Sequence, residues 1–440
     1  MKPIAYTTHW RALALLGVPI VIGQLGTIAQ SFADTMMVGQ YGTDELSASG
    51  FVNNVFNLAI FFLVGFSYST TPVVGRYYGQ GRSDCCGRAL RESLIVNASA
   101  FAGIAVFMLT LYACLPWLGQ PTALLPLIRP YFLIILASLL PMALFNAMKQ
   151  FSDGVGDTRT PMWIMIGGNV TNVLLNWLLI YGLPALHIPQ MGLNGAGWAT
   201  LASRLLMTVV LGTVVLCSRR FAPYRTGLQP TRRGMSHLVR KGLPISMQMA
   251  LESSSFNIAA IMMGWLGTTA LAAHQVMCTV GSLCFMFYYG VGAAAAVRMS
   301  HFRGRGQTSE LPRIATAAYL LCLASAVVLT GSIILFAPPL ISCFTTSADV
   351  VAMVLTLLLP FAVYQLGDSL QVVYANALRA VEDVKPLFGY AAVAYLVVSV
   401  PLSFLFGFIL KGGAAGIWWA FPFGLSTAGL LFLRRFRRSA

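Results

Sequence analysis

Apolar segments of about 20 residues recur along the whole chain, each followed by a short polar stretch. A helix rises 1.5 Å per residue, so each segment can cross a hydrocarbon core of about 30 Å. Many contain Gly, Pro, Ser or Asn, as is typical of membrane helices that pack closely or line a cavity. The pattern predicts an all-α polytopic membrane protein with twelve transmembrane helices, at residues 13–38, 50–75, 93–115, 131–150, 162–182, 194–217, 242–264, 271–297, 314–337, 351–376, 387–410 and 413–433.

Composition agrees with this fold class, because 57% of the residues are hydrophobic and 9% are charged, against about 25% charged in soluble domains. The first apolar segment is too long for a signal peptide and lacks a small-residue cleavage site, so we take it as the first span. The eight cysteines show no metal-ligand spacing.

The net charge of +15 would suggest a nucleic-acid partner in a soluble protein. An even number of spans puts both termini on one side, however, and nearly all of the 28 Lys and Arg residues then fall on that side, including Arg379 after the tenth span. Only Arg129 and Lys411 lie opposite, and Arg204 is the one basic residue inside a span. The positive-inside rule therefore predicts a multi-pass protein of the plasma (inner) membrane with cytoplasmic termini, in contact with membrane lipids and not with nucleic acid.

The chain is an internal duplication, in which Gly17 matches Gly242 and Gly65 matches Gly290 at one offset. The stretch MMVGQYGTDELSA at 36–48 likewise matches IMMGWLGTTALAA at 261–273. Six spans per repeat give both copies the same orientation, which predicts two lobes related by a pseudo-two-fold axis along the membrane normal.

We therefore predict an N-lobe at 1–217, a basic cytoplasmic linker at 218–241 and a C-lobe at 242–440. Transporters built from such repeats bind substrate between the lobes and rock one lobe against the other. One duplicated chain suffices for a complete pathway, so we expect a functional monomer.

Three acids lie within predicted spans, namely Asp34, Glu252 and Asp368. An ionised carboxylate at a bilayer centre costs about 2.5–3.5 kcal/mol on insertion scales, and such residues usually mark an ion or proton pathway. Each could hold a proton or coordinate a hard cation. Asp34 aligns with Ala259 and Glu252 with Thr27, so the acids are not part of the duplicated scaffold.

The neighbours of these acids leave several interpretations open. Tyr364 precedes Asp368 by one helical turn and is either a cation ligand or an ordinary interface residue. The aromatic run FMFYY at 285–289 either holds an organic cation or packs in a core. Three asparagines on one face of the fifth span indicate either a polar cavity or interhelical hydrogen bonds; they are Asn169, Asn172 and Asn176.

The sequence contains little that indicates an enzyme. DGVGD at 153–157 has the Asp-x-x-x-Asp spacing of membrane prenyltransferases, but such enzymes need two acidic motifs and the chain has one. We interpret it as turn and helix-cap chemistry. The chain has no Ser/His/Asp constellation and no phosphate-binding loop, so we predict a protein that is not an enzyme and has no cofactor.

Together these residues resemble the multidrug and toxic compound extrusion (MATE) family of cation-coupled transporters, most specifically in ADTMMVGQYG and LGTTALAAHQV. The resemblance covers nearly the whole chain and is greatest to the NorM-type branch. It implies an antiporter that exports cationic, amphipathic drugs and toxic compounds in exchange for Na⁺ or H⁺ by rocker-switch alternating access.

The resemblance also implies roles for single residues. Glu252 and Asp368 would form the cation site of the C-lobe and are the candidate Na⁺ ligands, with a contribution from Tyr364, while Asp34 would couple through the N-lobe. The expected substrate cleft includes Phe285, Asn176, Asn172 and Gln275.

A lipid-linked precursor flippase of the same superfamily is the alternative. It would place basic residues at its cleft, whereas the cations here lie in loops apart from Arg204.

Overall fold

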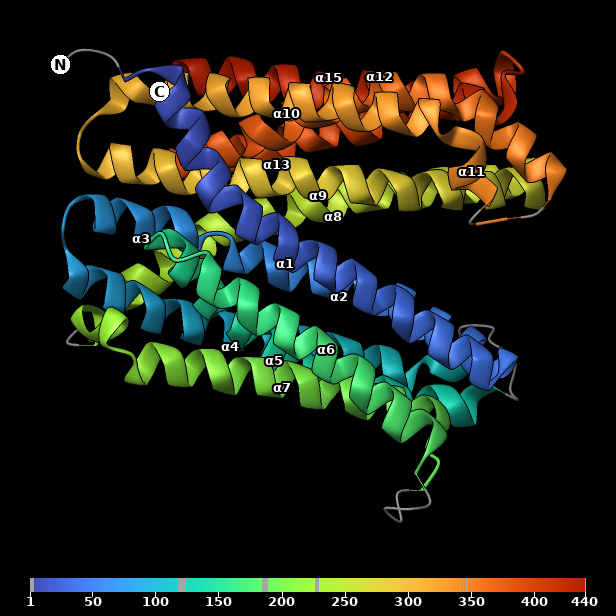
Figure 1. The fold of residues 1–440 in the computed structure, drawn as a ribbon, viewed down its shortest axis with the longest axis horizontal. Coiled ribbons are helices and arrows are strands. Elements are labelled where there is room, and N and C mark those ends of the chain that lie inside the picture. Colours follow the sequence, from blue (N-terminus) through green and yellow to red (C-terminus); the bar gives the residue numbers. More distant parts are fainter. Residues whose placement is uncertain are drawn as a thin grey trace. The chain divides into compact units, whose positions relative to one another are not determined.

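The structure, a computed structural model, describes residues 4–117, 124–183, 189–225, 229–342, 344–345 and 347–439. Helices make up almost all of these residues (Figure 1). In chain order they are α1 Tyr6–Tyr41, α2 Thr43–Ser67, α3 Thr70–Gly79, α4 Ser83–Ala113, η1 Leu115–Trp117, α5 Leu125–Gly154, α6 Arg159–Tyr181, α7 Gly192–Cys217, η4 Arg219–Tyr224, α8 Arg232–Leu266, α9 Thr268–Gly304, η5 Thr308–Glu310, α10 Leu311–Leu335, α11 Ala337–Ser342, α12 Ala348–Ala380, α13 Lys385–Ala391, η6 Ala392–Ser399, α14 Val400–Phe404, η7 Leu405–Ile409 and α15 Gly413–Ser439.

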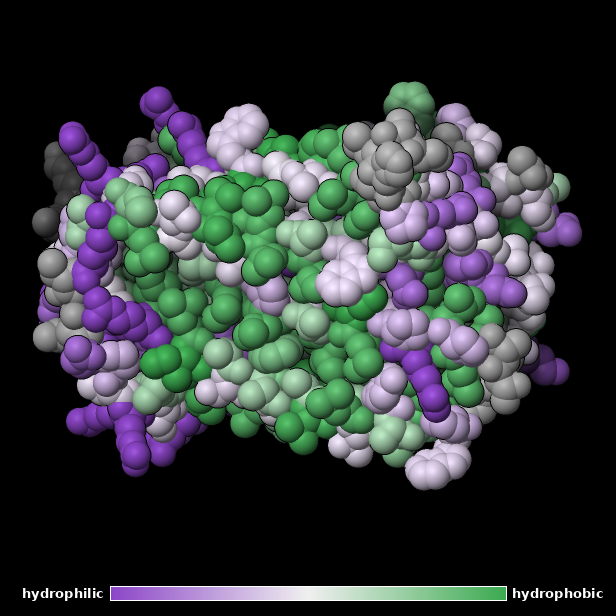
Figure 2. Space-filling model, turned by 90° about the horizontal axis from the view of Figure 1, so that it is seen from below, coloured by the Kyte–Doolittle hydropathy of each residue, from purple (hydrophilic) through white to green (hydrophobic). Residues whose placement is uncertain are grey.

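Eleven helical segments among the described residues are long and apolar enough to cross a membrane. The predicted seventh span lies in α8, which is not among the eleven because Gln248, Glu252 and a run of serines make it more polar. Large apolar side chains of α6 and α7, such as Trp163 and Val209, are exposed. On the face shown in Figure 2, apolar side chains cover the middle and hydrophilic ones gather toward both ends, as expected for a membrane protein.

Two predicted spans are less regular than the sequence indicated. The span at 50–75 is broken, because α2 ends at Ser67 and α3 starts at Thr70. The span at 387–410 contains two π-helical segments, η6 and η7, on either side of α14. Pro401 lies in the first turn of α14 and cannot donate a backbone hydrogen bond, so the regular α-helical ladder is interrupted there.

The chain forms two compact units, which we call the N-unit (Ile22–Ser246) and the C-unit (Met1–Val21 with Met247–Ala440). Their boundaries fall inside α1 and α8. The start of each of these helices therefore packs with the unit that holds most of the other repeat. In the predicted linker, residues 226–228 lie outside the described residues, and the helix α8 already begins at Arg232.

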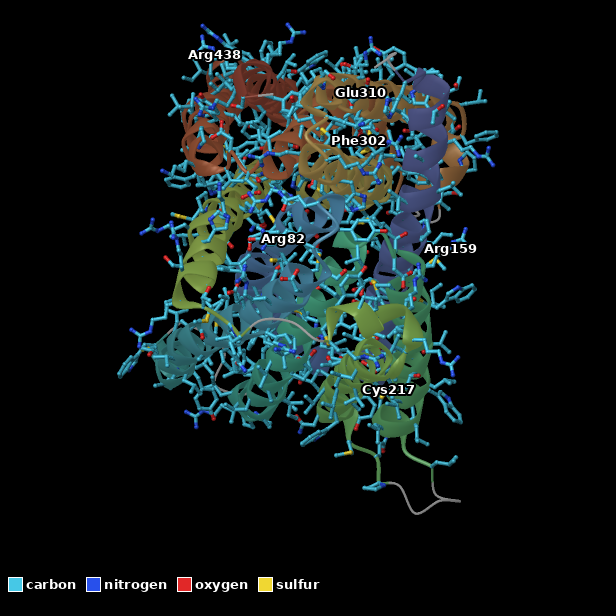
Figure 3. All side chains as sticks on the ribbon, turned by 90° about the vertical axis from the view of Figure 1, so that its left-hand side faces the viewer. Arg82, Arg159, Cys217, Phe302, Glu310 and Arg438 are labelled. Carbon is cyan, nitrogen blue, oxygen red and sulfur yellow. The ribbon has the colours of Figure 1, made fainter. Side chains whose placement is uncertain are left out.

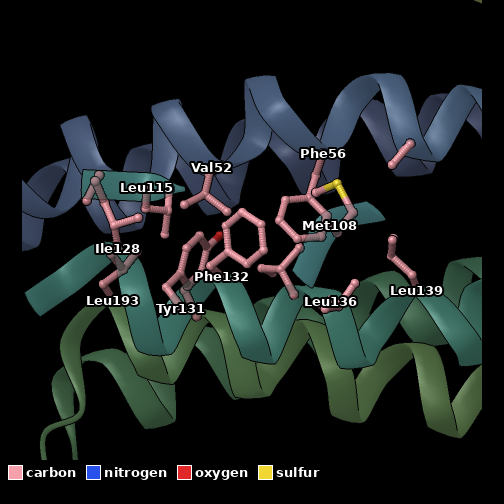
Figure 4. Close-up of a cluster of buried hydrophobic side chains, with 14 of the residues drawn as sticks. Val52, Phe56, Met108, Leu115, Ile128, Tyr131, Phe132, Leu136, Leu139 and Leu193 are labelled. Atoms are coloured by element: carbon pink, nitrogen blue, oxygen red, sulfur yellow. The ribbon is translucent and has the colours of Figure 1, made fainter. Parts of the chain in front are cut away.

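The N-unit has a core of apolar side chains between α2, α4, α5 and α7 (Figure 4). Phe56 and Phe132 are fully buried at its centre and meet edge to face, with ring centroids 4.7 Å apart. Met108 and Leu136 fill the space beside them. Edge-to-face aromatic pairs contribute about 0.5–1.5 kcal/mol beyond the area that they bury.

The C-unit is organised around α12, which packs along α15 and α9 (Figure 1). An aromatic cluster fills the interface of α12 with α15, where Trp418 of α15 lies edge to face against Tyr364 of α12 at 6.2 Å. Phe361 stacks on Tyr364 at 5.9 Å. These rings fix the part of α12 that leads to Asp368.

A buried polar cluster attaches the start of α1 to the C-unit. His9 is fully buried, and its Nδ1 accepts a hydrogen bond of 3.0 Å from Arg298 Nε on α9. Its Nε2 lies 3.3 Å from Glu310 Oε2, so a neutral imidazole with the proton on Nε2 satisfies both contacts. Figure 3 labels Glu310 and Phe302 in this part of the C-unit. The Phe302 ring lies 6.0 Å from the His9 ring.

The same part of α1 approaches α9 closely at a pair of glycines. A Cβ atom added to Gly17 would lie 3.2 Å from the carbonyl oxygen of Gly290. A Cβ atom added to Gly290 would overlap the side chain of Val21 and lie 3.1 Å from the oxygen of Gly17. Only glycine allows the two helices to come this close.

A second crossing in the N-unit is the repeat counterpart of the first. Gly242 on α8 and Gly65 on α2 correspond to Gly17 and Gly290 in the duplication. A Cβ atom added to Gly65 would lie 2.5 Å from the Cα of Ser246 on α8. The duplication has thus preserved a close helix crossing, and not only the helices that form it.

We predict that Gly290→Ala lowers the free energy of unfolding by about 1–3 kcal/mol, because the added methyl group overpacks the crossing. Gly331→Ala is the matched control, since its Cβ would meet no atom within 4 Å. Thermal unfolding of both purified variants in detergent measures the difference. Equal melting temperatures would contradict the role of the crossing.

Candidate ion and substrate sites

Glu252 lies on α8 within a set of amide side chains. Gln248, one turn earlier on the same helix, donates a hydrogen bond of 2.9 Å to Glu252 Oε2. Gln371 of α12 donates to the same oxygen at 3.1 Å, and the Tyr395 hydroxyl lies nearby on η6. These groups orient the carboxyl group between α8 and α12.

Arg379 is the main correction to the sequence analysis, which placed it in a loop after the tenth span. The helix α12 continues to Ala380, and Arg379 is buried in its last turn. Its Nη2 donates a hydrogen bond of 2.8 Å to Gln248 Oε1, and the guanidinium interacts electrostatically with Glu252. Asp368, Gln371 and Arg379 are separated by three and eight residues, a spacing that puts all three on one helical face. That spacing was the signal in the sequence.

Asp368 is 1% exposed and lies close enough to Glu252 for the two carboxyl groups to interact electrostatically. The Tyr364 hydroxyl lies beside it, one turn earlier on α12. The second carboxyl oxygen of Asp368, Oδ2, is buried without a hydrogen-bond partner. The structure therefore brings together Glu252, Asp368 and Tyr364, three residues that the family resemblance assigned to one site.

Further buried polar atoms near Asp368 lack hydrogen-bond partners. They belong to Gln365 (both amide atoms), Gln371 (Oε1) and Tyr288 (hydroxyl). Gln365 and Gln371 flank Asp368 on α12, and Tyr288 of α9 interacts electrostatically with it. A buried polar atom without a partner costs about 1–3 kcal/mol, and the several such atoms around this carboxyl group are available to a polar ligand.

This donor set fits a monovalent hard cation or a proton. No group of three or more His, Cys, Asp or Glu residues in the described part of the chain has a metal-binding arrangement. Carboxylate, amide and hydroxyl oxygens are available instead, and hard cations prefer oxygen ligands.

Tyr364 packs as a core residue, and its role as a cation ligand stays a prediction. Its ring packs edge to face against Phe256 at 6.3 Å and against Trp418 at 6.2 Å. Its hydroxyl, at the other end of the side chain, faces Asp368. The ring is therefore part of the core, and the polar end of the side chain lies next to Asp368.

The two candidate cleft residues of α9 differ in burial. Phe285 is partly buried, with its ring 6.2 Å from that of Tyr289. Gln275 is exposed. Within the run FMFYY, Tyr288 and Tyr289 are buried, so that run is in part a packed stripe.

The N-unit contains a separate polar cluster around Asp34. Asn176 Nδ2 donates hydrogen bonds to Asp34 Oδ1 and, at 3.3 Å, to Asn172 Oδ1. Asn172 donates in turn to Ser203 of α7 at 3.3 Å. The asparagine face of α6 therefore makes interhelical hydrogen bonds. Asn172 and Asn176 are fully buried, and their expected contact with substrate stays a prediction.

Arg204 of α7 supplies the opposite charge in this cluster. It interacts electrostatically with Asp34 and Tyr131, and its Nη1 donates a hydrogen bond of 2.7 Å to Ser138. Asp34 thus has a cation of its own within the same unit.

The acids of DGVGD have structural partners. Asp153 pairs with Lys149 at 2.9 Å. Asp157 accepts hydrogen bonds from the backbone and hydroxyl of Thr160 in the first turn of α6, and Arg220 lies 3.1 Å away. These contacts are the turn and cap chemistry that we expected.

Comparisons with known proteins agree in family and fold. The family model described as MatE matches residues 19–178 and 244–405. A probable multidrug resistance protein NorM of Bradyrhizobium diazoefficiens is 32% identical, with 95% of this chain and 91% of the relative covered. A multidrug resistance protein NorM of Vibrio cholerae is 28% identical, with 96% and 94% covered.

A solved structure, described as the outward-facing conformation of a multidrug resistance MATE family transporter, has a TM-score of 0.89 at 20% identity, with 100% of this chain and 98% of that chain covered. At this identity the likeness shows the fold alone.

We predict that Asp34 and Arg204 are energetically coupled. Asp34→Asn and Arg204→Gln should each lower the thermal stability, because each leaves one charge without its partner. The double variant should lose less free energy of unfolding than the two single variants lose together, and the difference is a coupling energy of about 0.5–3 kcal/mol. Thermal unfolding in detergent of the wild type, the two single variants and the double variant completes this double-mutant cycle. Additive losses would show that the two charges do not interact.

Proposed function

Because the chain belongs to the MatE family of membrane transporters, we propose that it is a Na⁺- or H⁺-coupled antiporter that exports cationic, amphipathic compounds. The NorM relatives are described as multidrug resistance proteins. The proposed ion binding rests on two acids of this chain, Glu252 and Asp368.

The observation that carries the proposal is the pairing of Glu252 with Asp368 inside the C-unit. Two carboxyl groups buried at one place repel each other unless a cation or proton lies between them. The oxygens of Gln365, Gln371 and Tyr288 without partners support a ligand at the same place. No duplicated structural role explains the pair, since Glu252 aligns with Thr27 in the first repeat.

The proposed mechanism is an exchange of ligands between two states. In the outward-facing state a Na⁺ ion or proton neutralises Glu252 and Asp368 and weakens the hold on the exported compound. In the inward-facing state the ion leaves, and the carboxylates attract an organic cation from the cytoplasm or inner leaflet. Coupling requires that each ligand favours a different state or excludes the other.

Further roles follow for the remaining residues. Phe285 offers an aromatic face to an organic cation, and Gln275 offers a polar contact on the same helix. Asp34 takes part in coupling through the N-unit, where its carboxyl group accepts a hydrogen bond from Asn176. The distribution of Lys and Arg supports a plasma (inner) membrane location with cytoplasmic termini, and one chain is proposed to work as a monomer.

Ethidium efflux from a pump-deficient bacterium tests the proposal. Cells that express the wild type, Asp368→Asn or Asp349→Asn are compared with and without a Na⁺ gradient at fixed pH. Asp349 is the matched control, because it is an exposed acid at the start of the same helix. We expect ion-driven efflux by the wild type and the control, and its loss in Asp368→Asn, whose side chain cannot carry the negative charge.

The ion dependence then separates the outcomes. Efflux that needs Na⁺ identifies the coupling ion, and efflux that follows the proton gradient alone reassigns it. Normal coupled efflux by Asp368→Asn would contradict the assignment of the site. A folded, inserted wild type that moves no organic cation would favour transport of lipid-linked precursors instead.

A further inference from the structure

The acids of the C-unit differ in how their charge is balanced. Three that lie outside the proposed site each have a basic partner of their own: Glu310 lies 3.8 Å from Arg313, Glu382 lies 3.4 Å from Arg303, and Asp383 lies 2.5 Å from Arg435. Glu252, by contrast, interacts electrostatically both with a cation, Arg379, and with a second acid, Asp368.

Arg379 reaches Glu252 through Gln248. The guanidinium donates to Gln248 Oε1 at 2.8 Å, and Gln248 Nε2 donates to Glu252 Oε2 at 2.9 Å. Arg379 therefore fixes which way the amide of Gln248 points, and the amide presents its donor to the carboxylate. Arg379 Nη1 also donates a hydrogen bond of 3.5 Å to Asn376 Oδ1.

The charges of the cluster leave a deficit of one positive charge. Arginine stays protonated in proteins, so Glu252 and Asp368 in their ionised forms and Arg379 together carry a net charge of −1. A net charge in a medium of low dielectric constant is costly. One monovalent cation, Na⁺ or H⁺, makes the cluster neutral, and a second would give it a net positive charge.

The polar cluster of the N-unit contrasts with this one. There Asp34 faces Arg204, and the two charges cancel without any added ion. Charge balance thus calls for an ion in one cluster and not in the other.

We propose that Arg379 is a permanent internal cation that limits the Glu252–Asp368 site to one coupling cation per transport cycle. The inference rests on the proposed antiport function. It makes Arg379 a positioning residue, which acts on the ion through Gln248 and Glu252. Exchange of one coupling cation for one singly charged substrate then moves no net charge across the membrane.

The test uses the full-length protein in liposomes with ethidium as the singly charged substrate. We would set Na⁺ and ethidium gradients against each other, with and without a membrane voltage, and find the condition at which net ethidium flux stops. A second set replaces the Na⁺ gradient with a pH gradient, which distinguishes the two possible ions. For the wild type we expect flux to stop where the two concentration ratios are equal, independently of voltage.

Three variants test the charge itself. Arg379→Gln leaves a net charge of −2, so the stopping condition should become voltage-dependent and follow about the square of the ion ratio. Arg379→Lys keeps the charge and should behave like the wild type. Glu252→Gln combined with Arg379→Gln restores the net charge of −1 and should bind one cation per protein, measured by equilibrium binding of ²²Na⁺ or by proton uptake. Arg438→Gln, an exposed change, controls for expression and reconstitution.

The outcomes separate the inference from the function on which it rests. A wild type that exchanges two or more cations per ethidium overturns the inference whether or not the variants fold. So does an Arg379→Gln protein that transports ethidium with the wild-type stoichiometry. A wild type that shows no ion-driven ethidium transport contradicts the proposed function instead.

Discussion

Burial of charge in an apolar medium is the constraint on which most of this structure depends. Each acid that leaves water must find a cation, a set of donors or a proton. Lys149 and Arg303 meet this need near the ends of α5 and α9, where they pair with Asp153 and Glu382. Such pairs hold the scaffold. Where the balance stays incomplete, as around Asp368, the protein has a reason to bind an ion.

The duplication shows how a scaffold and a site separate. The repeats share helices, turns and a close glycine crossing, all of which determine how the backbones pack. The three acids within the predicted spans are not shared, because Asp34 aligns with Ala259, Glu252 with Thr27 and Asp368 with Ala143. In the N-unit cluster Asp34 interacts with one base, Arg204, whereas in the C-unit cluster Glu252 interacts with one base, Arg379, and with a second acid, Asp368. One ancestral fold has thus acquired two electrostatic environments.

Much of this organisation could be predicted from the sequence, because membrane helices are defined by long apolar runs and an acid inside such a run stands out. Glu252 and Asp368 were therefore recognisable singly. Their proximity was not derivable, since it depends on how α8 and α12 pack. Arg379 was missed because hydropathy ends a span where polar residues begin, although α12 continues as a buried helix. The break between α2 and α3 was not predicted, because Tyr68 and Ser69 are not residues that strongly mark a turn.

The packing of the start of α1 has a consequence for the order in which the protein forms during synthesis. The N-unit is continuous in sequence, and the start of α8 completes it by Ser246. The start of α1, up to Val21, belongs to the C-unit, and its partners at Gly290, Arg298 and Glu310 are made nearly 300 residues later. Domains generally form in the order of their synthesis. The start of α1 is therefore synthesised well before its partners, and it reaches its native contacts only after α9 and α10 have been inserted.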